Sequence, residues 1–391
     1  LVSVPVSDSF SGIDRNTCQY TLDGATWYNA SYAMGNCGVW IDNNRLYDGQ
    51  DLSISLSVMD KAGNSSTTGI MEREVDKAYA TSSVNPLNSY YGPNSLPMIS
   101  GTASDTVSNV TDVKVRIERN SDGKNWVGRN TWSFIPGFQN VMGTNSWTLN
   151  KTLPTMTNGV TYTVTPYAWD QVQSGTQAGR SETFVWDSEL PQDPTRIWST
   201  SHTSTPSDDN TIEIRFSGAH DNLSGVKGYY YSFSHTPETP AIDSAHFLPA
   251  GAWRVTSNRL GDGIWYFNIR TIDNVGNITS TAHSIAYTID TIAPDAHITA
   301  PTSTYLSGEV EVKGTVTDVN PHTYSLNVYN IWNRRVAGTG NVDQTNSFTD
   351  SPIFTLDTTQ LADGVYTLRL ESRDAAGNQD LGSIDWKMII V

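Results

Sequence analysis

The chain of 391 residues has few basic residues, few cysteines and no long apolar run. Its 24 Lys and Arg stand against 40 Asp and Glu, giving a net charge of −16. This charge argues against nucleic acids and anionic membrane surfaces as partners. No apolar run approaches the roughly 20 residues of a membrane-spanning helix. No segment carries the capped i, i+3, i+4, i+7 apolar stripe of an amphipathic helix.

The chain contains one sequence motif four times, at residues 48–64, 158–174, 262–277 and 363–378. Each copy opens with Asp-Gly or Asn-Gly, a turn signal, and continues as a strand that alternates in polarity. Each strand then ends on an Asp, and in three copies Gly-Asn follows three residues later. The copies recur about every 100 residues, which is the length of one β-sandwich domain.

This repeat predicts an all-β protein of four tandem immunoglobulin-like β-sandwich domains in an elongated rod. The predicted domains are 1–78, 79–188, 189–292 and 293–391, and the second carries an insertion. The first domain begins on residues that align with an internal strand of the third. We therefore expect its first strand to be missing or supplied from elsewhere, either by more chain or by another molecule.

Short motifs carry a resemblance to a known family. They are D-x-x-S-G-[IV], Y-x-L-D-G-x-x-W, D-G-x-Y and D-x-x-G-N. With them the chain resembles the bacterial immunoglobulin-like (Big-type) tandem repeats of cell-surface proteins and adhesins. The resemblance implies stacked sandwiches, an extracellular position at the cell surface and no catalytic residue. The second domain departs from it, with DQVQSG at 170–175 in place of D-x-x-G-N.

One aromatic position recurs eight residues before the turn Asp, at Tyr162, Trp265 and Tyr366. It matches the place of a tyrosine corner, in which a buried aromatic residue bonds the backbone through its polar tip. We expect these residues to stabilise the fold.

The two cysteines, Cys18 and Cys37, both fall in the first domain. They form either a disulfide or two buried thiols, and we expect the disulfide. A bridge over so short a loop would stabilise by roughly 3 kcal/mol and would indicate an oxidising compartment. A zinc site is not expected, because no Cys/His cluster exists.

The D-x-x-G-N motifs have two possible interpretations. Gly and Asn tolerate the backbone of a tight turn, and the Asp can accept its N–H groups, so they suit a structural turn. Alternatively, these Asp residues and linker carboxylates could supply the oxygen ligands that calcium requires. No cofactor is required on the first reading, and calcium is the candidate on the second. The calcium candidates are Asp60, Asp187, Asp273, Asp290, Asp295 and Asp374.

Trp126, Trp132 and Trp147 fall close together around the insertion of the second domain. They would either stack on sugar rings in a glycan-binding site or pack in the core. Six sequons are candidates for glycosylation if the source modifies its surface proteins. Their asparagines are Asn29, Asn64, Asn109, Asn150, Asn222 and Asn277.

No catalytic motif is present, since the seven histidines form neither H-x-H nor H-E-x-x-H, and no G-x-S-x-G occurs. We do not expect an enzyme. The predicted function is a structural extracellular stalk, fibre or surface-layer segment. Its partners would be neighbouring copies or other surface proteins, and glycans on a second reading. The alternatives are an adhesin or carbohydrate-binding module, or an accessory region of a large secreted enzyme.

Overall fold

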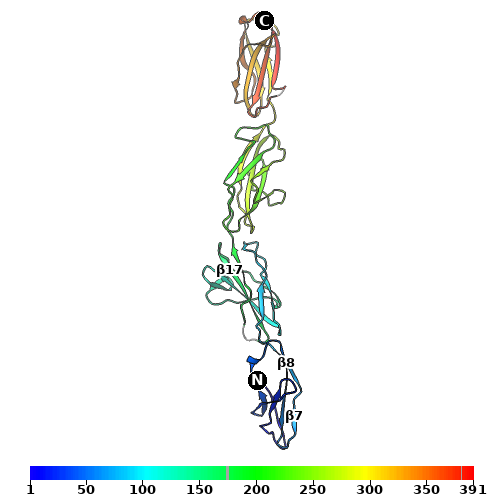
Figure 1. Cartoon of the computed structure of the whole chain (residues 1–391). Helices are drawn as coiled ribbons and strands as arrows, with labels where there is room; N and C mark the ends of the chain where they lie inside the picture. Colours follow the sequence, from blue (N-terminus) through cyan, green and yellow to red (C-terminus); the bar gives the residue numbers. More distant parts are fainter. Residues whose placement is uncertain (173–175, 380) are drawn as a thin grey trace. The chain divides into compact units, whose positions relative to one another are not determined.

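The computed structural model of the chain describes residues 1–172, 176–379 and 381–391 (Figure 1). It confirms an all-β fold, and its described helices are two single 3-10 turns, Asn43–Arg45 (η1) and Thr358–Gln360 (η2). The chain divides into two compact units, Leu1–Ser188 and Glu189–Val391. In each unit the described strands form four sheets. We refer to the predicted domains 1–78, 79–188, 189–292 and 293–391 as sandwiches one to four, and these boundaries remain a prediction.

Sandwich one has two small sheets. The first has the order β1-β5-β4, and the second has the order β3-β2-β6-β7 with β8 also paired to β6. The strands of the first sheet are β1 (Val2–Pro5), β4 (Ser31–Ala33) and β5 (Asn36–Val39). Those of the second are β2 (Gln19–Thr21), β3 (Tyr28–Asn29), β6 (Gln50–Met59), β7 (Ser65–Thr67) and β8 (Met71–Val75).

Sandwich two, in the same unit, has sheets of order β16-β11-β9 and β10-β18-β17-β12-β13-β14, with β15 also paired to β12. The first sheet contains β9 (Thr81–Val84), β11 (Ser100–Ser104) and β16 (Ser146–Thr148). The second contains β10 (Tyr90–Tyr91), β12 (Val110–Arg119), β13 (Lys124–Gly128), β14 (Thr131–Ser133), β15 (Gln139–Asn140), β17 (Thr161–Asp170) and β18 (Glu182–Trp186).

The second unit opens with sandwich three, which has sheets of order β19-β20-β23 and β22-β21-β24-β25. Its first sheet contains β19 (Arg196–Ser199), β20 (Glu213–Ser217) and β23 (Arg254–Thr256). Its second contains β21 (Val226–Ser234), β22 (Phe247–Pro249), β24 (Gly263–Asp273) and β25 (His283–Ile289).

Sandwich four repeats the same order, β26-β27-β31 and β29-β28-β32-β33, with β30 also paired to β28. Its first sheet contains β26 (Asp295–Ala300), β27 (Glu309–Thr317) and β31 (Phe348–Asp357). Its second contains β28 (Pro321–Asn330), β29 (Arg335–Gly338), β30 (Val342–Asp343), β32 (Val365–Asp374) and β33 (Ile384–Ile390).

In sandwiches two, three and four, the first strand belongs to one sheet and the residues that follow it contact the other sheet. It pairs antiparallel with the next long strand, as β9 does with β11, β19 with β20 and β26 with β27. The chain then meets the last strand of the other sheet in parallel. Those meetings are β10 with β18, Ser207 with Ile289 and Tyr305 with Ile390.

Local sequence explains the central strands. The Asp-Gly and Asn-Gly turns place Gly49 and Gly159 at φ of 74° and 72°, a region open to glycine without steric cost. The strands that follow alternate in burial, and in β6 Leu52, Ile54 and Leu56 are buried. One face of each such strand therefore lies on a core and the other faces out.

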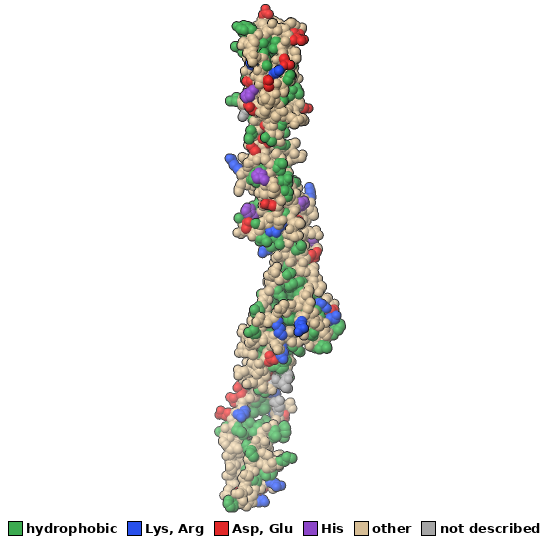
Figure 2. Space-filling model, turned by 180° about the vertical axis from the view of Figure 1, so that it is seen from behind, with side chains coloured by type: hydrophobic (Ala, Val, Ile, Leu, Met, Phe, Trp, Pro, Cys, Tyr) green, Lys and Arg blue, Asp and Glu red, His purple; other side chains and the backbone are tan. Residues whose placement is uncertain are grey.

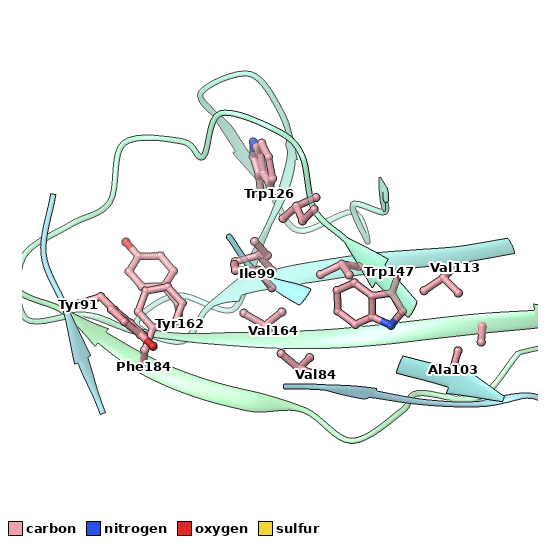
Figure 3. Close-up of a cluster of buried hydrophobic side chains, with 14 of the residues drawn as sticks. Val84, Tyr91, Ile99, Ala103, Val113, Trp126, Trp147, Tyr162, Val164 and Phe184 are labelled. Carbon is pink, nitrogen blue, oxygen red and sulfur yellow. The ribbon is translucent and has the colours of Figure 1, made fainter. Parts of the chain in front are cut away.

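Each sandwich contains its own cluster of buried hydrophobic residues. The cluster of sandwich two is built around large aromatic rings, and Figure 3 shows Trp126, Trp147, Tyr162 and Phe184 within it. The face drawn in Figure 2 carries charged side chains only sparsely. This agrees with the charged fraction of 16% in the sequence.

Candidate functional site

The turn Asp residues hold the last hairpins of their sandwiches. The Oδ1 atom of Asp273 accepts the backbone N–H groups of Val275 (3.0 Å), Gly276 (2.7 Å) and Asn277 (2.8 Å). Its Oδ2 atom accepts the side-chain amide of Asn277 at 2.7 Å. Asp60 accepts the same two groups from Asn64, at 2.8 and 2.7 Å. These contacts are those of a structural turn.

Side-chain hydrogen bonding by Asn64 is the largest cause that lowers the pKa of Asp60. Asp60 is thus ionised at neutral pH within its own turn. In sandwich two the corresponding Asp170 ends β17, and its Oδ1 atom accepts the N–H of Val172 at 2.8 Å. Residues 173–175 of the DQVQSG segment, which replaces D-x-x-G-N in sandwich two, lie outside the described residues.

A cluster of three carboxylates lies inside the second unit. One carboxylate oxygen from each of Asp290, Asp318 and Asp374 lies within 4.8 Å of the other two. Asp290 follows β25 and is 4% exposed, while Asp374 ends β32 and is 1% exposed. We refer to these three residues as the acidic cluster. It contains two of the predicted calcium candidates.

Hydrogen bonds hold the acidic cluster in place. The side-chain amide of Asn320 donates to Oδ2 of Asp290 at 2.7 Å, and its backbone N–H donates to Oδ1 of Asp318 at 2.6 Å. The side-chain amide of Asn378 donates both to Oδ2 of Asp374 and to the backbone carbonyl of Asp290, each at 2.7 Å. The two asparagines thus connect Asp290, at the end of sandwich three, to sandwich four.

The acidic cluster is electrostatically unfavourable when all three of its carboxylates are ionised. Burial raises the pKa of Asp318, and the charges of Asp290 and Asp374 raise it further. Its donors are all oxygens and come from three separate parts of the chain. This is the donor type that calcium selects, although calcium takes six to eight oxygens and these side chains alone are too few.

Sequence reasoning missed Asp318 as a candidate. The signal was present, since an Asp follows each of the equivalent strands β1, β11, β20 and β27, at Asp8, Asp105, Asp221 and Asp318. It could be recognised only by aligning the four copies at that loop. The predicted candidate Asp295 lies on β26, where it is exposed and pairs with His297 at 2.9 Å. It is not one of the three clustered acids.

A corresponding set of acids lies in the first unit. Asp76 follows β8 and is 8% exposed. Burial raises its pKa, and the charges of Asp105, Asp170 and Asp48 raise it further, while a hydrogen bond from Ser108 lowers it. Three of these acids occupy places equivalent to those of the acidic cluster. Asp76 follows β8 as Asp290 follows β25, Asp105 follows β11 as Asp318 follows β27, and Asp170 ends β17 as Asp374 ends β32. The remaining predicted candidate, Asp187, follows β18 and is 0% exposed.

The predicted tryptophan group is part of a core. Trp126 and Trp147 are 1% and 0% exposed, and they lie among Val84, Ile99 and Val164 in Figure 3. Trp132 is half-buried, with its ring 4.9 Å from the Arg119 guanidinium. The indoles of Trp126 and Trp147 therefore present no face to a sugar, and they fit the packing alternative.

The disulfide is confirmed, because Cys18 and Cys37 are bonded, with their Cα atoms 5.8 Å apart. Cys37 lies on β5 and Cys18 directly precedes β2, so the bond joins the two sheets of sandwich one. Both residues are fully buried, at 1% and 0% exposure.

The aromatic residues at the tyrosine-corner position bond the backbone. The hydroxyl of Tyr366 donates to the carbonyl of Ala362 at 2.9 Å, and Nε1 of Trp265 donates to that of Gly261 at 2.8 Å. Both acceptors lie four residues upstream. The hydroxyl of Tyr162 instead accepts the N–H of Thr157 at 2.8 Å.

Five of the six sequon asparagines are exposed, namely Asn29, Asn64, Asn109, Asn150 and Asn222. The side-chain amides of Asn64 and Asn277 are engaged by the Asp of their own turns, at 2.7 Å in both cases. A glycan on either nitrogen would therefore disturb that turn.

Histidines take part in local contacts. His202 is 3% exposed; its Nδ1 lies 2.9 Å from the hydroxyl of Ser201 and its Nε2 lies 2.9 Å from the carbonyl of Asp209. This Ser–His pair joins neighbouring residues, and its second nitrogen meets a backbone carbonyl instead of the carboxylate of a hydrolytic triad. No helix in the described part of the chain has the length and apolar character needed to cross a bilayer.

No family model and no curated protein matches the chain. Among solved structures, it is similar to the tetra-tandem repeat in the extending region of a large adhesion protein. The identity is 18% over 96% of this chain and 92% of that one, with a TM-score of 0.36.

Two further similar structures contain fibronectin domains. The chicken CNTN1 FN1–FN3 domains are 11% identical over 80% of this chain and 98% of theirs, with a TM-score of 0.25. The fibronectin(III)-like modules of Clostridium thermocellum CbhA are 10% identical over 50% of this chain and 94% of theirs, with a TM-score of 0.27. Likenesses at these TM-scores carry no argument about fold or function. The strand topology supports the β-sandwich fold. The narrower resemblance to Big-type repeats stays an expectation.

Proposed function

We propose that this chain is a structural segment of an extracellular protein, a stalk, fibre or surface-layer spacer in which four tandem sandwiches hold other parts at a distance. The observation that carries the proposal is the short, hydrogen-bonded connection inside each unit. β25 ends at Ile289 and β26 begins at Asp295, and Asp290 between them is bonded by Asn320 and Asn378 of the next sandwich.

The first unit has a comparable connection. Asp48 of sandwich one accepts the backbone N–H groups of Lys77 and Ala78, at 2.7 and 3.0 Å, and the hydroxyl of Thr106 in sandwich two at 3.0 Å. Short linkers that are bonded on both sides limit bending. The disulfide agrees with an oxidising, extracellular compartment.

Small-angle scattering of the full chain tests the spacer function. A compact globule of this length would have a radius of gyration of about 21 Å. We expect a value well above this, and we expect Asn320→Ala to broaden the distance distribution by loosening one connection. Ser303→Ala, on an exposed loop of the same sandwich, is the matched control. A radius near that of a globule would contradict the proposal.

We further propose that the acidic cluster binds calcium and stiffens the connection inside the second unit. Three carboxylates this close repel one another, and a divalent cation among them would offset the repulsion. Water and neighbouring carbonyl groups would supply the oxygens that the three side chains do not.

Calcium titration with thermal denaturation of the full chain tests this second proposal. At a calcium concentration 100-fold above the dissociation constant, binding stabilises the folded state by about 2.7 kcal/mol. We expect Asp318→Asn to lose that gain and Asp295→Asn, an exposed acid outside the acidic cluster, to keep it. An unchanged melting temperature at millimolar calcium would remove calcium from the proposal but leave the spacer function standing.

Glycan binding is an alternative function, and a partly exposed aromatic cluster of sandwich two favours it. Phe138 contacts Tyr167 and Trp169 edge-on, at centroid distances of 5.0 and 6.2 Å, and Lys114 lies 5.2 Å from the Trp169 ring. Aromatic faces beside polar groups are suited to sugar rings. A glycan array with the chain and its Trp169→Ala variant tests this; signals that persist unchanged in the variant would contradict it.

A further inference from the structure

One outer surface of sandwich three carries a group of basic side chains. The sheet β19-β20-β23 packs alternate residues into the core cluster of this sandwich. The residues between them face away from the core, because side chains alternate along a strand. They include Arg196 on β19, Arg215 on β20 and Arg254 on β23. We refer to these three arginines, together with Trp198 and Trp253 beside them, as the arginine face.

The charge of the arginine face is opposite to that of the sandwich that carries it. Residues 189–292 contain six Lys and Arg against eleven Asp and Glu. Half of those basic residues lie on the arginine face, and Glu213 is the only acid in its three strands. Sandwich three is therefore an acidic domain with one positive surface, and such a surface attracts negatively charged partners.

The strand register brings the arginines together. Arg215 lies opposite Trp198 on one neighbouring strand and opposite Arg254 on the other. Neighbouring strands are about 4.8 Å apart, so the long side chains of this row can reach one extended ligand. The three arginines therefore form a row across the sheet, with Arg196 beside it on β19.

Two indole rings hold the guanidinium groups in place. The guanidinium carbon of Arg196 lies 5.1 Å from the centre of the Trp198 ring. Those of Arg215 and Arg254 lie 5.4 and 5.0 Å from the centre of the Trp253 ring. An aromatic ring attracts a cation through its π-electrons and accepts no conventional hydrogen bond. The arginines are thus positioned while their N–H groups stay available.

Two of the three guanidinium groups have no acidic partner. Arg215 pairs with Glu213, with its Nη2 and Nε atoms each 3.0 Å from the Oε1 atom. The ion pairs and side-chain hydrogen bonds of the described residues include neither Arg196 nor Arg254. Both of these arginines are exposed. Their donors can therefore bind an anion from outside the chain.

The outer surface of sandwich two differs in this respect. Four basic residues of β12 and β13 lie between 2.7 and 3.9 Å from a carboxylate oxygen of the same sandwich, and these are Lys114, Arg116, Arg119 and Lys124. Their charges are already compensated. Available guanidinium donors thus distinguish the arginine face from the outer sheet of sandwich two.

We propose that the arginine face binds an anionic polysaccharide, whose carboxylate or sulfate groups accept hydrogen bonds from the three arginines. A guanidinium group presents two parallel N–H donors to such an anion. Because the arginines come from three adjacent strands, they suit a polymer that crosses the sheet and offers several anionic groups in a row. Trp253, which is 52% exposed, adds apolar surface for a sugar ring. The inference goes beyond the spacer function, because it assigns a ligand to this segment.

Titration calorimetry of the full chain with three oligosaccharides of equal length tests the proposal. Oligogalacturonate carries carboxylates, sulfated dextran carries sulfates, and unmodified dextran carries neither. The buffer contains EDTA, so that calcium cannot bridge acidic groups. We expect at least one anionic oligosaccharide to bind, more weakly as salt is added, and unmodified dextran not to bind. Which of the two binds identifies the preferred anion.

Three outcomes would overturn the proposal. The first is that neither anionic oligosaccharide binds at millimolar concentration. The second is that unmodified dextran binds as tightly as the anionic forms. The third is that a polyglutamate peptide binds more tightly than either oligosaccharide, because the face would then be assigned to an acidic protein.

Matched variants locate the site on the chain. Arg254→Gln should weaken binding about tenfold or more, because a charge-assisted hydrogen bond is lost. Arg254→Lys keeps the charge without the paired donors, and its affinity should lie between those of the wild type and Arg254→Gln. Lys227→Gln removes an exposed charge from β21, in the other sheet, and should change little. Equal weakening by Arg254→Gln and Lys227→Gln would mean that net charge alone attracts the ligand, and the arginine face would not be its site.

Discussion

Sandwiches one and two lie in the same unit, but different interactions stabilise them. The hydrophobic cluster of sandwich one is small, with Cys18, Cys37, Leu56 and Val58 as its buried members among the described residues. The cluster of sandwich two contains Trp126, Trp147, Tyr162 and Phe184, each nearly inaccessible. Small cores bury too little surface to be stable alone, and a disulfide compensates by restricting the unfolded chain.

The residue at the tyrosine-corner position also differs between sandwiches one and two. Tyr162 occupies it in sandwich two and bonds the backbone of Thr157. In sandwich one, the residue eight positions before Asp60 is Leu52, which has no polar tip. Sandwich one thus lacks the aromatic corner, and it carries the cross-link. The comparison indicates that a covalent bond takes the place of a non-covalent contact.

The largest expected effect is loss of the buried indole of sandwich two. Trp147→Ala should destabilise that sandwich by about 3–5 kcal/mol, because it removes a large side chain and leaves a cavity. Chemical denaturation of the full chain, followed by hydrogen exchange in β11 and β17, measures it. Phe134→Ala is the control, since Phe134 is 73% exposed and its loss should change little. Equal effects from the two variants would break the comparison.

Removal of the disulfide should have the next largest effect. The double variant Cys18→Ser and Cys37→Ser should destabilise sandwich one by about 3 kcal/mol, as expected for a closed loop of this size. Hydrogen exchange in β6 should report the loss, while β17 in sandwich two should be unaffected. Thiol labelling of the denatured, unreduced wild-type chain should find no free cysteine, and stoichiometric labelling would contradict the bond.

The hydroxyl of Tyr162 is expected to contribute less. Tyr162→Phe should cost about 0.5–1.5 kcal/mol, because the N–H of Thr157 loses its acceptor. The same change at Tyr90, which is 36% exposed, serves as control. Denaturation curves for the two variants that coincide with that of the wild type would show that the corner adds nothing to the stability of sandwich two.

The smallest expected effect concerns the connection between the two sandwiches. A carboxyl with a raised pKa favours folding while protonated, so its contribution is present below about pH 3.8 and is lost as pH rises through the folded-state pKa. Burial raises the pKa of Asp76. In EDTA at pH 7, Asp76→Asn should therefore be more stable than the wild type, and the gain should shrink as the pH falls toward 4.

Thermal denaturation between pH 4 and 8 measures this difference. Asp51→Asn, at an exposed position of β6, controls for the change in net charge. A variant at Asp76 that loses stability at pH 7 would mean that its charge is favourable in place, and the repulsion argument would be wrong.

Local sequence was sufficient to predict the strands and the cross-link. Alternation in β6 and β32 identifies a strand with one buried face, and this depends only on residues two apart. The repeated Asp-Gly turns locate the strand starts, since few residues accept the backbone that such a turn needs. Two cysteines in one small domain have only each other as partners, and the structure confirms their bond.

Only the tertiary structure decided which acidic residues lie together and whether the tryptophans are buried or exposed. Asp290, Asp318 and Asp374 are far apart in sequence, and they meet because three strand ends converge after folding. Sequence reasoning chose Asp295 in place of Asp318, since a linker position says nothing about which way a strand edge faces. Trp126 and Trp147 could have lined a surface or a core, and a register shift of one residue would exchange the two outcomes. Which face of a strand is covered depends on the sheet packed against it, and that is a property of the folded chain.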